Sequence, residues 1–196
     1  GGRIETVLEV GAPRPEAAAT VDFGGRLVAP GFVEGHVHLD TSFIGDAWVP
    51  HKPNTAGFDV RERVRFQNEN LAEAAPLAER ARAQMELCLA QGSTRMRSHL
   101  IVDLARGLSH AEALLEMRAA WADRIDLQLC AFPQSGILAE PGVADLMDEA
   151  MALGCDVVGG LDPAGFDGDL EGQLDVVFGL AERHGAPVDI HLHDAG

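Results

Sequence analysis

The chain has 196 residues, and its 31 Asp and Glu against 15 Lys and Arg give a formal net charge of −16. This acidity excludes nucleic acid as an expected partner, because binding to phosphate backbones depends on Lys and Arg. Hydrophobic residues make up 46% of the sequence, which excludes a disordered chain and supports a buried core, and no apolar run is long enough to span a membrane.

Residues 1–30 contain short pieces in which apolar and polar residues alternate, a pattern that indicates strands, with Gly24-Gly25 as a turn signal. We interpret this segment as part of a small N-terminal β domain and residues 31–196 as a second domain. The sequence begins without a methionine and ends directly after an apolar, strand-like run. We therefore expect the chain to be a piece of a longer protein.

From Phe32 onward, apolar strand-like runs alternate with helical stripes. The expected strands are 32–39, 94–102, 126–132, 155–161 and 187–192, and the expected helices are 76–91, 110–121, 142–153 and 170–184. The first interval between strands is about twice as long as the others, which predicts an insertion in the loop 41–58. Strict alternation predicts a parallel sheet covered by helices, and this pattern fits both a barrel and a doubly wound sheet.

The strongest chemical signal is His36-Val37-His38 at the end of the first expected strand. Residues i and i+2 of a strand point to the same side, so both imidazoles would project near the carboxyl end of the strand, where parallel α/β folds build their sites. A second motif, His191-Leu192-His193, closes the last expected strand. Imidazoles from two strands predict a mononuclear zinc or iron site. The alternative is that they are hydrogen-bonded core or surface histidines, and in the second motif we expect one ligand and one histidine that only lines the strand end.

Four segments of the chain match the sequence and the order of one known family. They are PGFVEGHVHLDT at 30–41, AFPQSGI at 131–137, DVVGG at 156–160 and VDIH at 188–191. With them, residues 20–196 resemble the amidohydrolase superfamily, and more narrowly the bacterial cytosine deaminases and their relatives. The resemblance implies an α/β fold, a TIM-like (β/α) barrel that is incomplete in this chain, with about five βα units.

The resemblance also implies a metal at the carboxyl-terminal mouth of the barrel. His36 and His38 would be ligands from the first strand, and His191 would be the ligand from the fifth. We expect one divalent ion, zinc or iron, because binuclear relatives use a lysine from the fourth strand, and the only lysine here is Lys52 in the first loop. The relatives also supply a histidine from the sixth strand and an aspartate from the eighth, and no residue of this chain matches them.

The resemblance also implies roles for three further residues. Gln134 stands where the relatives hold the substrate ring, and its amide offers both a donor and an acceptor. His99 matches a histidine of the relatives and would line the substrate pocket, the alternative being a satisfied core histidine. Asp194 takes the place of a glutamate that shuttles protons, so a carboxylate is kept with a shorter reach, and this change puts cytosine itself in doubt as the substrate.

These residues together predict a metal-dependent hydrolase, a deaminase that cleaves a C–N bond of a small nitrogen heterocycle. The alternatives are a hydrolase that removes an alkylamine from a triazine or opens a cyclic amide, and a non-catalytic metal-binding module. We expect a small-molecule partner, with a homo-oligomer as an option, and neither nucleic acid nor membrane. The three cysteines are widely spaced and form no CxxC motif, so we expect reduced thiols and a cytoplasmic protein.

Overall fold

The computed structural model describes residues 3–50 and 52–192, and the chain divides into two units, residues 1–30 and 31–196. No strand is present between residues 3 and 30, whereas the sequence indicates short strands there. A strand needs a partner for its backbone groups, and residues 3–30 form no strand pairing among themselves. The N-terminal β domain therefore stays a prediction.

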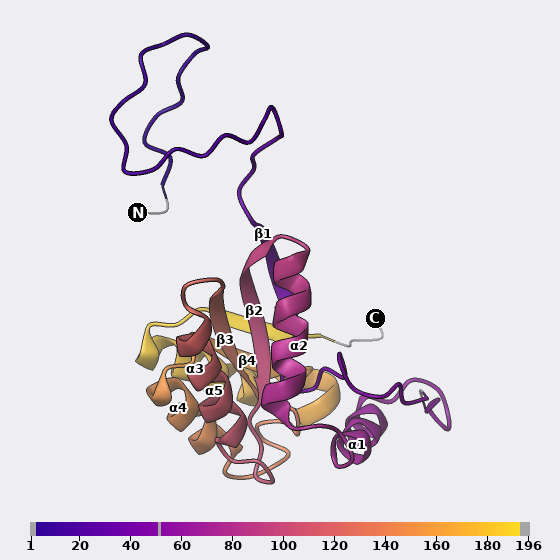
Figure 1. Ribbon diagram of the computed structural model, residues 1–196. Coiled ribbons are helices and arrows are strands. Elements are labelled where there is room, and N and C mark those ends of the chain that lie inside the picture. Colours follow the sequence, from indigo (N-terminus) through magenta and orange to yellow (C-terminus); the bar gives the residue numbers. More distant parts are fainter. Residues whose placement is uncertain (1–2, 51, 193–196) are drawn as a thin grey trace. The chain divides into compact units, whose positions relative to one another are not determined.

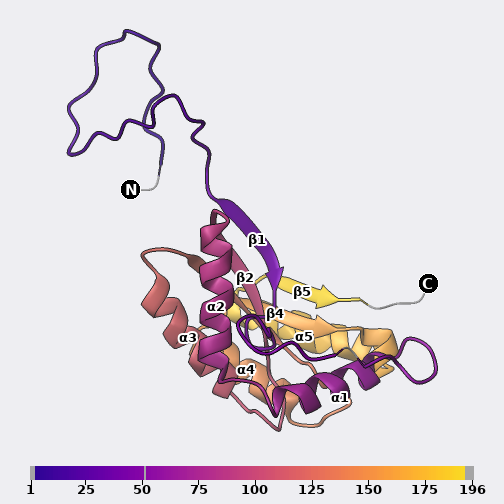
Figure 2. The same cartoon turned by 45° about the vertical axis from the view of Figure 1, so that its right-hand side comes forward.

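The second unit is built on one parallel sheet. Its strands, within the described residues, are β1 (Phe32–Val37), β2 (Ser93–Ile101), β3 (Asp126–Phe132), β4 (Val157–Leu161) and β5 (Val188–His191). They lie side by side in the order β1-β2-β3-β4-β5. In a doubly wound sheet the order reverses at a switch point, whereas consecutive order is that of a barrel. The sheet also curls (Figure 1 and Figure 2), so the structure confirms the incomplete TIM-like barrel.

Four helices that the sequence predicts cover one face of this sheet (Figure 1). They are α2 (Leu77–Ala90), α3 (Ser109–Trp121), α4 (Val143–Leu153) and α5 (Leu170–His184), and the short π-helical turn η1 (Pro163–Asp167) links β4 to α5. Their apolar stripes form the core, in which Met85, Leu114, Met147 and Val177 are buried together with Leu129 of β3. Among the described residues, no helix is both long enough and apolar enough to cross a membrane.

The insertion after β1 contains a further helix, α1 (Val60–Leu71), which the sequence analysis did not predict. None of its residues is fully buried, and its Val60 and Val64 are partly buried against a small hydrophobic cluster of Phe132, Leu161 and Phe166. Its start is fixed by Asp59, whose side chain accepts hydrogen bonds from the backbone N–H groups of Arg61 and Glu62. Polar contacts then attach it to the loops that follow the strands: Arg106 donates to Asn68 at 2.8 Å, and Arg61 to the carbonyl of Phe166.

Candidate metal centre and adjoining pocket

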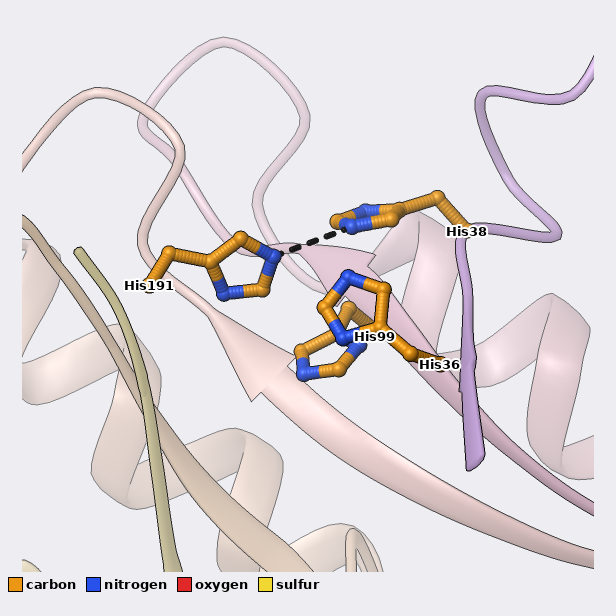
Figure 3. A group of neighbouring side chains, drawn as sticks. All are labelled: His36, His38, His99 and His191. Atoms are coloured by element: carbon orange, nitrogen blue, oxygen red, sulfur yellow. Dashed lines mark hydrogen bonds between the residues drawn. The ribbon is translucent and has the colours of Figure 1, made fainter. Parts of the chain in front are cut away.

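Four imidazoles converge at the mouth of the half-barrel (Figure 3). His36 lies in β1, His38 directly follows it, His99 lies in β2 and His191 ends β5. One ring nitrogen from each lies within 4.8 Å of the others. The structure thus brings together the three predicted ligands and adds His99, which the sequence analysis assigned to the substrate. The roles of the four as ligands or substrate contacts stay predictions.

The curl of the sheet explains how residues so far apart in the chain meet. β1 and β5 lie at opposite ends of the strand order, yet His38 Nε2 is 3.2 Å from His191 Nε2. The pairing of β1 with β2 runs from Glu34–Met96 to Val37–Ser98, so β1 contains one extra residue between the two pairs. Such a bulge changes the direction of the side chains beside it.

Burial favours the neutral form of three imidazoles of this cluster, those of His38, His99 and His191. Desolvation lowers the pKa of His38 to about 4, while the charge of Asp40 opposes the shift. Desolvation and the neighbouring His99 and His38 lower the pKa of His191 to about 3. Burial also lowers the pKa of His99, which is fully buried. Neutral imidazole is the form that binds a metal, so no proton has to be removed at neutral pH.

The donor set and its spacing fit a divalent ion. Imidazole nitrogens are suitable ligands for zinc and for iron. Two ligands at the usual zinc–nitrogen length, in tetrahedral geometry, lie roughly 3.3 Å apart. The 3.2 Å between the Nε2 atoms of His38 and His191 matches that spacing. Both nitrogens can therefore serve one ion with little movement of either ring.

An ion pair between Arg97 of β2 and Asp189 of β5 lies next to the histidine cluster. Asp189 Oδ2 accepts from Arg97 Nη1 at 2.8 Å and lies 3.5 Å from His99 Nε2. Although burial opposes it, the hydrogen bond from Arg97 lowers the pKa of Asp189. Sequence reasoning missed this pair, although each member stands two residues before a histidine, and the two-residue period of a strand could have revealed it.

A pocket of about 350 Å³ adjoins the histidines. It lies within the size range of small-molecule sites, and most of the surface exposed in its walls is apolar. Its lining residues are His38, Thr41, Phe58, Val60, Arg63, Val64, Gln67, Phe132, Gln134, Leu161 and His191. Gln134, predicted to hold the substrate ring, thus lies in the wall of this pocket, whereas His99 is not among the described lining residues.

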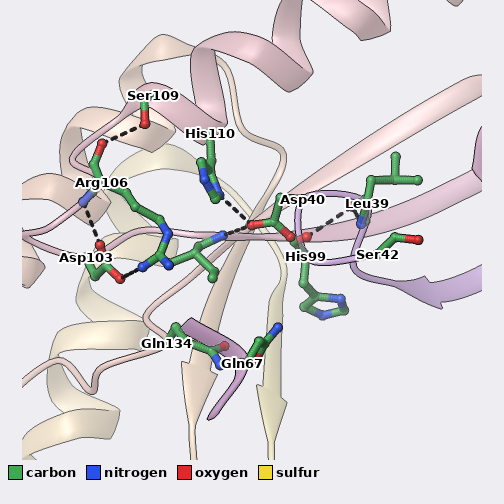
Figure 4. Close-up of polar contacts among 12 residues, drawn as sticks. Leu39, Asp40, Ser42, Gln67, His99, Asp103, Arg106, Ser109, His110 and Gln134 are labelled. Carbon is green, nitrogen blue, oxygen red and sulfur yellow. Dashed lines mark hydrogen bonds and ion pairs between the residues drawn. The ribbon is translucent and has the colours of Figure 1, made fainter. Parts of the chain in front are cut away.

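Gln134 is bound directly to α1, since its Nε2 donates to Gln67 Oε1 at 3.0 Å (Figure 4). The loop that follows Gln134 is fixed by Asp167, which the sequence analysis did not place in the site. The carboxylate of Asp167 accepts the backbone N–H groups of three consecutive residues, Ile137, Leu138 and Ala139, at 3.0–3.2 Å. Because the carboxylate comes from η1 and the amides from the β3–α4 loop, no local sequence pattern could have linked them.

The chain just beyond His38 is held by a buried carboxylate (Figure 4). Asp40 Oδ2 accepts from the backbone N–H of Ile101 at 2.7 Å and lies 2.8 Å from His110 Nδ1. Arg80 donates to the backbone carbonyl of Asp40 at 3.0 Å. These contacts fix the point where the chain leaves the histidine cluster and turns toward α1. Asp194, the predicted proton shuttle, and His193 lie outside the described residues.

Comparisons with known proteins agree with this site. Residues 19–196 match the model of the Amidohydrolase family. The chain is 32% identical to N-isopropylammelide isopropyl amidohydrolase of Pseudomonas sp. (strain ADP), over 90% of this chain and 44% of that protein. Among solved structures, N-isopropylammelide isopropylaminohydrolase from Burkholderia multivorans superposes with a TM-score of 0.76 at 39% identity, covering 85% of this chain and 41% of that one. For 5-methylcytosine deaminase from Klebsiella pneumoniae, the TM-score is 0.72 at 32% identity, covering 92% of this chain and 44% of that one.

The chain, whose second unit contains the histidine cluster, therefore spans less than half the length of these relatives. The family match covers that unit from the first strand to the last, including all four histidines of the cluster. On this evidence the chain belongs to the amidohydrolase family.

Proposed function

We propose that this chain belongs to a metal-dependent hydrolase that removes an amino group from a ring carbon of a small nitrogen heterocycle. One observation carries the proposal: a cluster of four imidazoles opens onto a pocket of about 350 Å³ with an amide in its wall. The volume suits a single small ring with a substituent, and the apolar side chains of Phe132 and Leu161 suit its faces.

In this proposal His36, His38 and His191 hold one divalent ion, zinc or iron. Such an ion supplies Lewis-acid chemistry and makes water nucleophilic at neutral pH. A single ion is proposed because Lys52, the only lysine, is engaged elsewhere: its Nζ forms an ion pair with Glu69 at 2.6 Å.

The other residues orient the ring and move protons. Gln134 binds the edge of the ring through its amide, and the hydrogen bond to Gln67 fixes the direction of that amide. The apolar surface of the pocket lowers the local polarity around a bound ring, which strengthens polar contacts to the substrate. Asp194, three residues after His191, would accept one proton from the attacking water and deliver it to a ring nitrogen. It would then carry the second proton, from the hydroxyl group that has added to the ring carbon, to the amine that leaves as that hydroxyl becomes a carbonyl.

A second candidate is removal of an alkylamine instead of ammonia. Two of the relatives reported above are named for action on an isopropyl group of N-isopropylammelide, and one of them has the higher identity of the two solved structures, 39% against 32%. Val60 and Val64 of α1 add apolar surface to the pocket that could take an alkyl group. Opening of a cyclic amide and metal binding without catalysis are the remaining alternatives.

Product analysis on the full-length protein, loaded with zinc or iron, separates these functions. The substrates are cytosine, isocytosine, creatinine, aminotriazines and N-isopropylaminotriazines, and the products measured are ammonia, isopropylamine and ring-opened acids. Release of ammonia supports the deaminase, and release of isopropylamine supports removal of an alkylamine. A ring-opened acid supports opening of a cyclic amide. Bound metal without any product would contradict all three and support a metal-binding module. His38→Ala serves as the control, because release must disappear with the predicted ligand.

A further inference from the structure

One wall of the pocket is formed by α1, a helix outside the βα repeat of the barrel. Gln67 and Arg63 stand four residues apart on this helix, so they occupy the same face, and both line the pocket. His38 and His191 line the same cavity. A ligand that reaches the histidines therefore presents another of its edges to α1.

The hydrogen bonds already made on this wall determine what remains available to a ligand. Gln67 Oε1 faces Gln134, because it accepts from Gln134 Nε2 at 3.0 Å. The Nε2 of Gln67, with two hydrogens, has no acceptor within the described part of the chain. The wall therefore presents the donor end of this amide, and the acceptor end is turned to Gln134.

Arg63 adds further donors and a positive charge. Its Nη1 donates to the backbone carbonyl of Lys52 at 2.6 Å, which ties the guanidinium to the loop before α1. The remaining guanidinium N–H groups have no acceptor among residues 3–50 and 52–192. Guanidinium has no acceptor of its own, so the polar groups of this wall are donors.

We propose that Gln67 and Arg63 are specificity-determining residues that select heterocycles with carbonyl oxygens or delocalised negative charge along the edge facing α1. A ring with amino groups there would set donors against donors and leave them without partners at the pocket wall, which costs binding energy. The substrate class is thus an oxo-substituted, weakly acidic ring that carries its amino or alkylamino group at the edge facing the histidines. This inference rests on the proposed function for the assumption that the pocket binds a heterocycle.

Binding of two probes with the same ring tests the inference without requiring turnover. Cyanuric acid presents three carbonyl groups and melamine presents three amino groups on one triazine ring. Titration calorimetry on the full-length protein gives the Kd of each, and we expect cyanuric acid to bind at least about tenfold more tightly. Gln67→Glu keeps the shape and the acceptor for Gln134 but replaces the NH2 group with an oxygen. We expect it to reduce the preference for cyanuric acid by about 5- to 100-fold.

The matched control is Gln91→Glu, the same change at an exposed position after α2, and it should leave the preference unchanged. Arg63→Met should weaken the binding of cyanuric acid more than the binding of melamine, because it removes the positive charge without changing Gln67. Tighter binding of melamine by the wild-type protein, failure of both probes to bind, or an unchanged preference in Gln67→Glu would overturn the inference. If the protein catalyses the reaction but Gln67→Glu keeps the preference for cyanuric acid, this inference is refuted and the proposed function stands. If Gln67→Glu reduces that preference but no catalysis is found, the inference stands and the proposed function is refuted.

Discussion

Asp167 should be a main determinant of where Gln134 lies, although it does not contact the pocket. Its Oδ2 accepts from the backbone N–H groups of Ile137 and Leu138 and from Gln173 Nε2, and its Oδ1 accepts from Ala139. Asp167→Asn leaves one oxygen and turns an NH2 group toward at least one of these donors. One bond is lost and the others lose the charge of the acceptor, so we expect a loss of about 1–3 kcal/mol in the free energy of unfolding.

The control for this prediction lies two residues away. Asp169 caps α5 by accepting from the backbone N–H of Gly172 at 2.9 Å. Asn caps helices about as well as Asp, so Asp169→Asn should change stability by less than about 0.5 kcal/mol. Urea unfolding of the full-length protein measures the stability, and hydrogen exchange of residues 137–139 reports the loop directly.

We expect faster exchange of these three amides and a raised KM for a ring substrate in Asp167→Asn alone, with unchanged metal content. Equal stability and equal exchange in Asp167→Asn and Asp169→Asn would refute the reasoning, because the two variants make the same chemical change.

Three further predictions concern the same site. Gly136→Ala should destabilise the protein by about 1–3 kcal/mol in urea unfolding, because Gly136 has a φ of +84° and an added Cβ would overlap the carboxylate of Asp167. Gly179→Ala is the control and should not destabilise the protein, because Gly179 lies at an open position of α5. The metal-free protein should lose stability as the pH falls from about 6.5 toward 4. His38 and His191 have pKa values of about 4 and 3 in the folded protein, so over this range they take up protons only in the unfolded chain. Unchanged stability over this range would contradict the burial of the two rings. Asp194→Asn should lower kcat by about 10²- to 10⁴-fold with metal content unchanged, and full activity would exclude it as the proton shuttle.

Much of the barrel could be predicted because its strands are apolar and its main helices carry apolar stripes. Strand β3 and helix α5 lie where the pattern indicates, at Asp126–Phe132 and Leu170–His184. Helix α1 was not predicted because none of its residues is fully buried, and it is held by polar contacts to loops together with the partial burial of Val60 and Val64. The spacing of Asp59 and Glu62 was the available signal, since an Asp followed three residues later by Glu is typical of a helix start.

The candidate site, too, could be predicted only in part from the sequence. His36 and His38 could be grouped from sequence because a strand places i and i+2 on one side, and the resemblance supplied His191. Their convergence with His99 depends on the curl of the whole sheet, which no local pattern encodes. The contact between Gln67 and Gln134 likewise joins a helix and a loop 67 residues apart, so only the three-dimensional structure reveals it.

Metal stoichiometry tests the central claim, that the histidine cluster is the metal centre of this amidohydrolase, most directly. Elemental analysis of the full-length protein and of His38→Ala, His191→Ala and His184→Ala gives zinc and iron per chain. His184 is the matched control, because it lies in α5 and contacts Asp148 rather than the cluster. The account predicts one ion per chain in the wild type and in His184→Ala, and loss of that ion in the other two variants. Full metal content in His38→Ala and His191→Ala would contradict it.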